Sequence, residues 1–266
     1  MESRFDTGLL DNLEILQTGL CSHAFPLHYH DSFCLSLINK GMMAENNVIA
    51  PAGSLLISHP FEVHQNDLVH ETNYALTTFY VSSDLFASLA LEKNFCFEEK
   101  VLSDNELYTS FVRLSALAAK GKIIDRKRFE SCFIASAQQL INKYATPQPF
   151  TAINNPHLLD SVKQYIIEHI DQKISLDTLA KMTGKDKYQF IRWFRKLTGL
   201  TPMHFMILNR VEKAKKMMKA GKPIVRAALD AGFYDQSHFT NYFKHFTGIT
   251  PKEYQQHCNI FQDFGA

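Results

Sequence analysis

Three histidines in the first quarter of the chain have the residue type and spacing to bind a ligand. His28 and His30 are separated by one residue, so both imidazoles lie on one face of a strand, and His64 follows the turn sequence at 51–53 by eleven residues. Neutral imidazoles line a pocket as hydrogen-bond partners, cap strands and loops, or hold Zn²⁺ or Fe²⁺. We interpret these histidines first as effector-binding residues. The structural and the metal-binding interpretations stay open, the last being the least favoured.

The residues that follow the first two histidines divide between two faces of a strand. If His28 and His30 face inward, the side chains that share their face are Ser32, Cys34 and Ser36. The opposite face carries Phe33, Leu35 and Leu37. A mixed polar lining favours a small polar metabolite over a fatty acid as the ligand.

Two stretches near the C-terminus have the spacing of paired helices with a basic, polar outer face. In the first, Ser175 and Asp186 are N-caps on either side of a turn at Gly184; in the second, Gly232 supplies the turn and Asp235 the cap. Helical spacing predicts an inward-facing stripe in each stretch. The stripe is Phe190, Phe194 and Leu197 in the first, and Phe239, Phe243 and Phe246 in the second. The outer faces carry the candidate DNA-binding residues Lys187, Tyr188, Ile191, Arg192, Arg195, Gln236, Ser237, Thr240, Asn241 and Lys244. Gln, Asn and Arg read base edges, and Lys neutralises phosphate.

The two stretches are copies of one unit. Each ends in Thr-Gly, at 198–199 and at 247–248, which is an offset of 49 residues. Between them, Thr201 caps and Pro202 opens a helix that we expect to run to about Ala220. A helix of that length spans ~27 Å, and recognition helices in successive major grooves lie ~34 Å apart. One chain is therefore expected to read two adjacent grooves.

Residues 157–257 resemble the DNA-binding domain of the AraC/XylS family of bacterial transcription regulators. The matching motifs are S-L-x-x-L-A (175–180), F-x-R-x-F (190–194), G-x-T-P (199–202), R-x-x-x-A-K (210–215), A-G-F (231–233), S-x-F (237–239) and F-K-x-x-x-G-x-T-P (243–251). The resemblance implies that the base-facing residues are Tyr188, Ile191 and Arg192 in the first unit, and Gln236, Ser237, Thr240 and Asn241 in the second. The chain departs from the family at Asn241, where an arginine is common. This departure concerns the strength and the sequence preference of DNA binding by the second unit.

The N-terminal part is similar to the cupin barrel. The order of His-x-His, a glycine turn, Pro-x-Gly and a later histidine carries the resemblance. Cupins of this type hold a divalent metal through those histidines and a glutamate, but Phe33 and Cys34 stand where the glutamate is expected. Sensor barrels of the resembling regulators are commonly without metal. We therefore expect no metal and no cofactor, and effector binding at His28, His30 and His64.

Charge divides the chain into unlike halves. The length of 266 residues allows about two domains. Residues 156–257 hold 17 Lys and Arg against 9 Asp and Glu, a net charge of +8, while the rest holds 11 against 18, a net charge of −7. A basic domain is what phosphate neutralisation requires. The scattered cysteines and the absence of a signal pattern or a long apolar run predict a cytoplasmic protein with reduced thiols and no membrane partner.

These features predict an α+β chain of two domains. Residues 1–145 form a cupin-like effector-binding and dimerisation domain with an arm at 1–20 and strands from 21 to 82, arranged as a small antiparallel barrel or sandwich. Residues 146–155 are the linker, 156–257 the all-α domain with two helix-turn-helix units, and 258–266 a tail. Two apolar helical stripes lie between 103 and 145, one with Leu107, Phe111, Leu114 and Leu117, and one with Phe129, Cys132, Phe133, Ser136, Leu140 and Ile141. We expect them to form a homodimer interface in preference to packing on the barrel alone.

The predicted function is transcription regulation without catalysis. The expected partners are double-stranded promoter DNA, a small-molecule effector, a second copy of the chain and RNA polymerase, as for an activator. Effector binding would shift the population of DNA-binding arrangements. Two alternatives remain: a metal-dependent cupin enzyme joined to a DNA-binding domain, and a regulator that needs no ligand.

Overall fold

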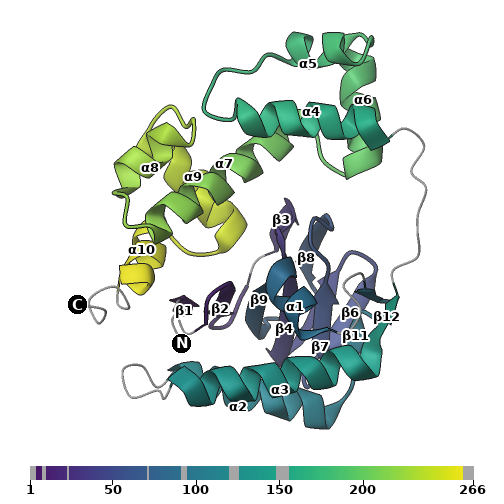
Figure 1. The fold of residues 1–266 in the computed structure, drawn as a ribbon, viewed down its shortest axis with the longest axis vertical. Helices are drawn as coiled ribbons and strands as arrows, with labels where there is room; N and C mark the ends of the chain where they lie inside the picture. Colours follow the sequence, from purple (N-terminus) through teal and green to yellow (C-terminus); the bar gives the residue numbers. More distant parts are fainter. Residues whose placement is uncertain are drawn as a thin grey trace. The chain divides into compact units, whose positions relative to one another are not determined.

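The chain folds into two compact units. The computed structural model describes residues 4–7, 10–22, 24–70, 72–90, 95–119, 126–147 and 156–259. The division between the units falls after Pro149, with the C-terminal unit extending from Phe150 to Asn259. Sheets make up most of the first unit and helices make up the second (Figure 1). The predicted α+β class with two domains is confirmed.

Antiparallel strands of the N-terminal unit form two main sheets. The six-stranded sheet has the order β1 (Arg4–Thr7), β2 (Leu13–Gln17), β9 (Ala75–Ser82), β4 (Ser32–Lys40), β7 (Leu55–Ser58) and β11 (Val101–Leu102). The four-stranded sheet has the order β3 (Phe25–His28), β8 (His64–Leu68), β5 (Met42–Glu45) and β6 (Val48–Pro51). A separate pair joins β10 (Phe95–Phe97) to β12 (Ala145–Pro147). Among the described residues the strand ladder divides between these sheets, so the structure is a sandwich and not one continuously hydrogen-bonded barrel.

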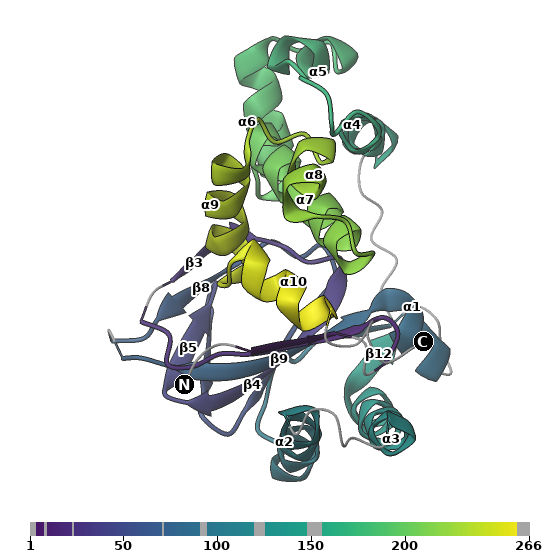
Figure 2. The same ribbon diagram turned by 90° about the vertical axis from the view of Figure 1, so that its left-hand side faces the viewer.

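The six-stranded sheet uses its two faces differently, because side chains alternate along β4 and β9. On one face Phe33, Leu35 and Phe79 are buried in a core shared with helices α1 (Ser83–Leu89), α2 (Asn105–Ala119) and α3 (Arg126–Tyr144). Figure 2 shows α2 and α3 lying on one side of the sheet that holds β4 and β9. The other face packs Ile38 and Leu56 against Met43 of the four-stranded sheet. The predicted division into an apolar and a mixed face is confirmed for β4. The prediction that His28 and His30 lie on one strand is wrong, because β3 ends at His28 and His30 lies between β3 and β4.

Several N-terminal boundaries differ from expectation. The predicted arm at 1–20 contains β1 and β2, and β2 pairs with the central strand β9. Its apolar residues Leu13 and Ile15 are almost fully buried, which explains why this segment is part of the sheet. Ser82 accepts the hydrogen bond from Leu85 N that starts α1. The strand β12 extends two residues into the expected linker, and the rest of that linker lies outside the described residues.

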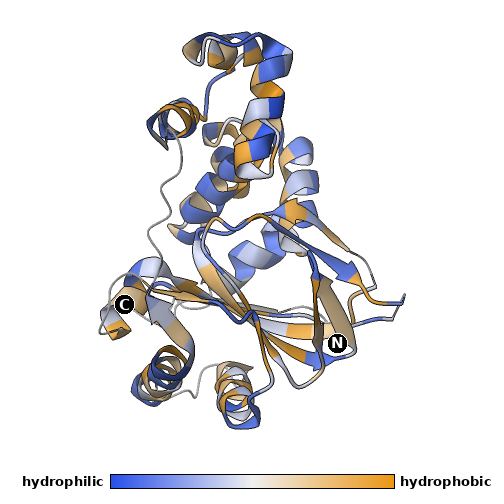
Figure 3. Ribbon diagram, turned by 90° about the vertical axis from the view of Figure 1, so that its right-hand side faces the viewer, coloured by the Kyte–Doolittle hydropathy of each residue, from blue (hydrophilic) through white to orange (hydrophobic). Residues whose placement is uncertain are grey.

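The two apolar helical stripes are buried inside the N-terminal unit. Leu107, Phe111 and Leu114 of α2 pack in the same core as Phe129, Phe133 and Leu140 of α3. In Figure 3 these two helices, at the bottom of the view, carry hydrophobic and hydrophilic residues on different sides. Cys132, which we placed on the stripe, is exposed. The prediction that the stripes form the dimer interface is therefore wrong, because the sheet already covers them. The homodimer itself stays a prediction.

The C-terminal unit consists of helices. In order they are α4 (Pro156–Glu168), α5 (Leu176–Met182), α6 (Lys187–Thr198), α7 (Pro202–Lys219), α8 (Ile224–Asp230), α9 (Gln236–Thr247) and α10 (Pro251–Asn259). The predicted spacer helix is α7, whose 18 residues begin after an N-cap hydrogen bond from His204 N to Thr201. In the described part of the chain, none of the helices has both the length and the apolar character needed to cross a lipid bilayer.

Candidate DNA interface and histidine cluster

Helix α6 presents a fixed outer face because its start and its inner face are both determined. Asp186 accepts hydrogen bonds from Tyr188 N at 2.9 Å and Gln189 N at 2.8 Å, and the Gln189 side chain accepts from Asp186 N. This reciprocal capping sets the first turn. Phe190 and Phe194 are fully buried, so the residues between them must point outward. The helix ends at Gly199, whose φ of 77° is left-handed.

The predicted DNA-binding residues of α6 are available to a ligand. Lys187, Tyr188, Arg192 and Arg195 are exposed, and Ile191 is half-buried. Tyr188 stands out with 76% of its surface exposed, an unusual state for an aromatic side chain. The prediction that Leu197 points inward is wrong, because it is 42% exposed and Leu200, beyond the helix end, is buried instead.

Helix α9 repeats this design. Asp235 accepts a hydrogen bond from His238 N at 2.7 Å, and the inner face consists of the buried residues Phe239, Phe243 and Phe246. The outer face carries Gln236, Ser237, Asn241 and Lys244, which are exposed, and Thr240, which is half-buried. Each of the ten predicted DNA-binding residues thus lies on an outer face, and none is buried. Their contact with DNA stays a prediction.

Close backbone contacts join the second turn to the rest of the unit. Gly232 has a φ of 93°, and a Cβ at this position would lie 2.6 Å from the carbonyl oxygen of Ile170. Arg210 of α7 donates from Nε to the same Ile170 oxygen at 2.9 Å and from Nη2 to the Gln172 oxygen at 2.9 Å. The spacer helix is therefore tied to the segment after α4 and to the turn before α9.

Two aromatic features of this surface were not expected from the sequence. Tyr234, in the turn before α9, is 89% exposed. The Nζ of Lys185 lies 5.5 Å from the ring centroid of Trp193 on α6. An aromatic residue next to an N-cap is a signal that sequence analysis can use, whereas the cation–π contact depends on the turn geometry.

His28, His30 and His64 come together in the N-terminal unit. Each offers a ligand nitrogen, and these nitrogens all lie within 4.8 Å of one another. The ring centroids of His28 and His64 are 4.4 Å apart, and His30 lies edge-on to Tyr80 with centroids 4.8 Å apart. His28 and His64 are buried and His30 is half-buried. The sequence prediction that these three residues share one site is supported by their proximity, although no ligand contact is tested.

Backbone carbonyls select the tautomer of two of these rings. His28 Nδ1 lies 2.7 Å from the carbonyl oxygen of Pro26, and His64 Nδ1 lies 2.9 Å from that of Glu62. A carbonyl oxygen only accepts hydrogen bonds, so Nδ1 carries the proton in each ring. In the neutral form of each ring, the lone pair is then on Nε2. Burial lowers the pKa of His64, more than the nearby Glu45 carboxylate raises it, so the ring is neutral at neutral pH.

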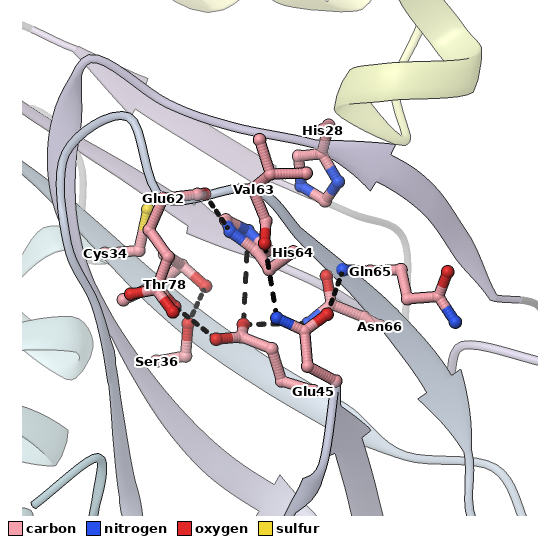
Figure 4. A network of polar contacts seen from close by, with 12 residues as sticks. His28, Cys34, Ser36, Glu45, Glu62, Val63, His64, Gln65, Asn66 and Thr78 are labelled. Atoms are coloured by element: carbon pink, nitrogen blue, oxygen red, sulfur yellow. Dashed lines mark hydrogen bonds and ion pairs between the residues drawn. The ribbon is translucent and has the colours of Figure 1, made fainter. Parts of the chain in front are cut away.

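A buried carboxylate lies beside His64. Glu45 of β5 is 2% exposed, and its Oε2 lies 4.0 Å from His64 Nε2. Ser58 Oγ donates to Oε1 at 2.7 Å, and Asn66 Nδ2 donates to Oε2 at 3.2 Å. Figure 4 shows Glu45, His64 and Asn66 in one network, with Ser36 and Thr78 beside it. This glutamate comes from another strand and not from the residues after His30, where Phe33 and Cys34 stand.

Comparisons with known proteins agree on both units. A family described as the AraC-like ligand binding domain matches residues 13–131, and one described as the helix-turn-helix domain matches residues 179–257. An uncharacterised HTH-type transcriptional regulator of Bacillus subtilis, YbfI, is 30% identical over 226 residues, which cover 80% of this chain and 81% of that protein. The probable transcriptional regulator LumQ of Photobacterium leiognathi is 30% identical over 95 residues, which cover 35% of this chain and 38% of that protein.

The fold has a solved counterpart. The crystal structure of ToxT from Vibrio cholerae O395 is similar, with a TM-score of 0.55 and 14% identity over 96% of this chain and 98% of that one. The structure of ToxT bound to an unsaturated fatty acid gives a TM-score of 0.53 at 14% identity, over 96% of each chain. At this identity the likeness concerns the fold alone.

Proposed function

Because this chain belongs to the AraC family of HTH-type transcription regulators, we propose that it binds promoter DNA through α6 and α9 and that a ligand of the N-terminal unit controls this binding. The coarser part follows from the two family matches of this chain, one to a ligand-binding domain and one to a helix-turn-helix domain. The finer part concerns which residues read DNA and where the ligand binds.

The observation that carries the proposal is the repeated design of α6 and α9. Each helix has an aspartate N-cap, a buried phenylalanine stripe and an exposed outer face rich in side chains that recognise DNA. We assign base contacts to Tyr188, Ile191 and Arg192 of α6, and to Gln236, Ser237, Thr240 and Asn241 of α9. Lys187, Arg195 and Lys244 contact phosphates. Arg192 pairs with the two acceptors of a guanine, and Gln236 and Asn241 suit adenine.

We place the effector at His28, His30 and His64. ToxT has been crystallised with an unsaturated fatty acid, but here polar groups surround the histidines, including Glu45 and Asn66. Burying such groups against an alkyl chain would leave them without partners, which disfavours a fatty acid. A polar ligand that binds one arrangement of the chain more tightly shifts the population that binds DNA. A second copy of the chain and RNA polymerase complete the proposed assembly.

The test maps genomic binding sites of the wild-type chain, of Arg192→Ala and of Lys252→Ala as a control. Lys252 is an exposed cation on α10, so both variants lose one positive charge. We expect sharp wild-type sites that persist with Lys252→Ala. Arg192→Ala should weaken specific binding by about 1–3 kcal/mol and relax the preference at one base position. If Arg192→Ala keeps the wild-type sites and base preference, α6 does not read DNA through this side chain.

A further inference from the structure

We propose that His28, His30 and His64 bind one divalent first-row transition-metal ion, and that the buried Glu45 carboxylate beside His64 compensates its charge. The regulatory role of this ion rests on the function proposed above. In that role, the ion is itself the ligand that controls DNA binding, or it holds that ligand in the site. The ion binds through one nitrogen of each histidine. The site lies within the four-stranded sheet and the turn after β3.

The positions of the ligand atoms suit one ion. Zinc binds imidazole nitrogen at about 2.0–2.1 Å, so two nitrogens on one tetrahedral ion lie roughly 3.4 Å apart. The three histidine nitrogens already lie within 4.8 Å of one another. Small rotations of the imidazole rings bring them to the bonding distance. Glu45 Oε2 lies 4.0 Å from His64 Nε2, so the carboxylate charge is next to the proposed ion.

The hydrogen bonds of the histidines prepare two of them for coordination. The Nδ1 atoms of His28 and His64 are held by the carbonyl oxygens of Pro26 and Glu62. A metal-bound histidine usually donates its second N–H to a carbonyl or carboxylate in this way, which sets the tautomer and the ring orientation. Both Nε2 atoms are therefore the lone-pair donors. By contrast, the nearby His59 accepts a hydrogen bond from Phe97 N at its Nε2 and serves the fold.

Glu45 supplies the negative charge that a cation requires. A carboxylate that is 2% exposed is costly unless a cation or several hydrogen bonds compensate it. In the part of the chain that the structure describes, its hydrogen-bond donors are the neutral side chains of Ser58 and Asn66. These two bonds orient the carboxylate, and a divalent ion would compensate its charge. Ser58 belongs to the six-stranded sheet, so the site also connects the two layers of the sandwich.

The donor set selects the class of metal. Three imidazole nitrogens with an open fourth position suit Zn²⁺, Fe²⁺, Co²⁺ or Ni²⁺. Mg²⁺ and Ca²⁺ prefer sites made of oxygen atoms alone. Zn²⁺ and Ni²⁺ are convenient probes because neither is oxidised under ordinary assay conditions.

The experiment measures metal bound per full-length chain. Protein is stripped with a chelator, dialysed against Zn²⁺ or Ni²⁺, and analysed for metal by mass spectrometry. We expect one ion per wild-type chain and a rise in Tm when the ion binds. His30→Ala should weaken binding by about 100-fold or more, and Glu45→Gln by about 10–100-fold. His70→Asn is the matched control, because His70 is exposed in the same unit and asparagine tolerates its φ of 50°.

Melting of each variant without metal separates loss of the site from loss of the fold. His30 is only half-buried, so His30→Ala should melt near the wild-type Tm and show no rise with metal. Failure of the wild type to bind either ion stoichiometrically, or wild-type affinity in His30→Ala, would overturn the metal site. DNA binding is measured on the same preparations. If the wild type binds no metal but binds DNA sequence-specifically, the metal site alone is rejected. If the wild type shows no sequence-specific DNA binding either with or without metal, the proposed function is rejected.

Discussion

Gly232 shows how a single missing side chain lets the second helix-turn-helix unit pack. Its φ of 93° is unfavourable for any residue with a Cβ, and an added Cβ would approach the Ile170 oxygen to 2.6 Å and the Asp171 Cα to 2.9 Å. Gly184 occupies the equivalent turn of the first unit with a φ of 65°, but a Cβ there would have no neighbour within 4 Å. The two turns therefore share a backbone requirement but differ in packing.

This difference predicts unequal effects of the same substitution. Gly184→Ala should lower the free energy of unfolding by about 1–2 kcal/mol, which is the cost of a left-handed residue with a Cβ. Gly232→Ala adds a backbone clash and should cost at least twice as much. Trp193, the single tryptophan, lies on α6, so its fluorescence during urea unfolding reports on the C-terminal unit. Equal losses in the two variants would show that the contact with Ile170 relaxes without cost.

Local sequence patterns predict buried positions and helix caps where these depend on residues close in the sequence. Phe190 and Phe194 were placed inside from their helical period, and Asp186 was recognised as a cap, because each depends on neighbours within four residues. Leu197 fits the same period but is exposed, since the chain turns at Gly199 and buries Leu200 in its place. The position of Glu45 could not be predicted from local spacing. Strand pairing brings it to His64 and Ser58, which are distant in the sequence.

At the scale of elements, the helical stripes of α2 and α3 were predicted correctly as amphipathic but assigned to the wrong partner. A sequence period shows that a face is buried, but it does not show what covers that face. Here Phe79 and Leu35 of the six-stranded sheet share a core with Phe111 and Leu140. A polar substitution at Leu140 would therefore unfold the N-terminal unit before it could report on a dimer.

Asp104 connects the two helices where α2 begins and α3 ends. Its carboxylate accepts hydrogen bonds from Leu107 N at 3.0 Å, from Lys143 Nζ at 2.6 Å and from Tyr144 OH at 2.9 Å. The hydrogen bond from Lys143, followed by that from the Leu107 backbone, lowers the pKa of Asp104 to about 2. One side chain thus caps α2 and holds the last turn of α3.

Asp104→Asn should destabilise the N-terminal unit by about 0.2–1 kcal/mol at neutral pH, because asparagine still caps α2 but loses the ion pair with Lys143. The depressed pKa means that the charged form stabilises the fold above the unfolded pKa of about 3.9. The difference between wild type and variant should shrink as pH falls from about 4 to about 2. Circular dichroism during urea unfolding measures it, with Trp193 fluorescence identifying the transition of the other unit. Asp84→Asn, an exposed change in the first turn of α1, is the control. A difference that persists unchanged at low pH would contradict the role of the charge.

At the scale of the whole molecule, charge and composition predicted two domains of unlike chemistry. The net charges of +8 and −7 follow the division that the structure places after Pro149. The sequence could not show that an acid lies beside the histidine cluster, nor that β1 and β2 join the sheet, because both depend on which strands pair. The DNA-binding unit was more predictable, since its motifs are short, duplicated and confined to neighbouring turns.

The continuous helix α7 leads to a prediction about operator spacing. The two helix-turn-helix units are joined by 18 helical residues, and Arg210 within that helix is bonded to the segment after α4. We therefore expect a fixed separation of the two recognition helices, suited to adjacent major grooves about 10 base pairs apart. Inserting 5 base pairs between the two subsites would place them on opposite faces of the DNA. Inserting 10 base pairs would return the two subsites to the same face of the DNA but would increase the distance between them by about 34 Å.

Both insertions should weaken binding of the full-length chain by about 10-fold or more, which is ~1.4 kcal/mol, because a rigid spacer reaches neither arrangement. Fluorescence anisotropy with labelled operators measures the affinity, and the same insertions placed outside the operator are the controls. Units joined flexibly would behave differently, since they would tolerate the 10-base-pair insertion and reject only the 5-base-pair one. Recovery of affinity at 10 base pairs would therefore show that α7 does not hold the two recognition helices at one separation.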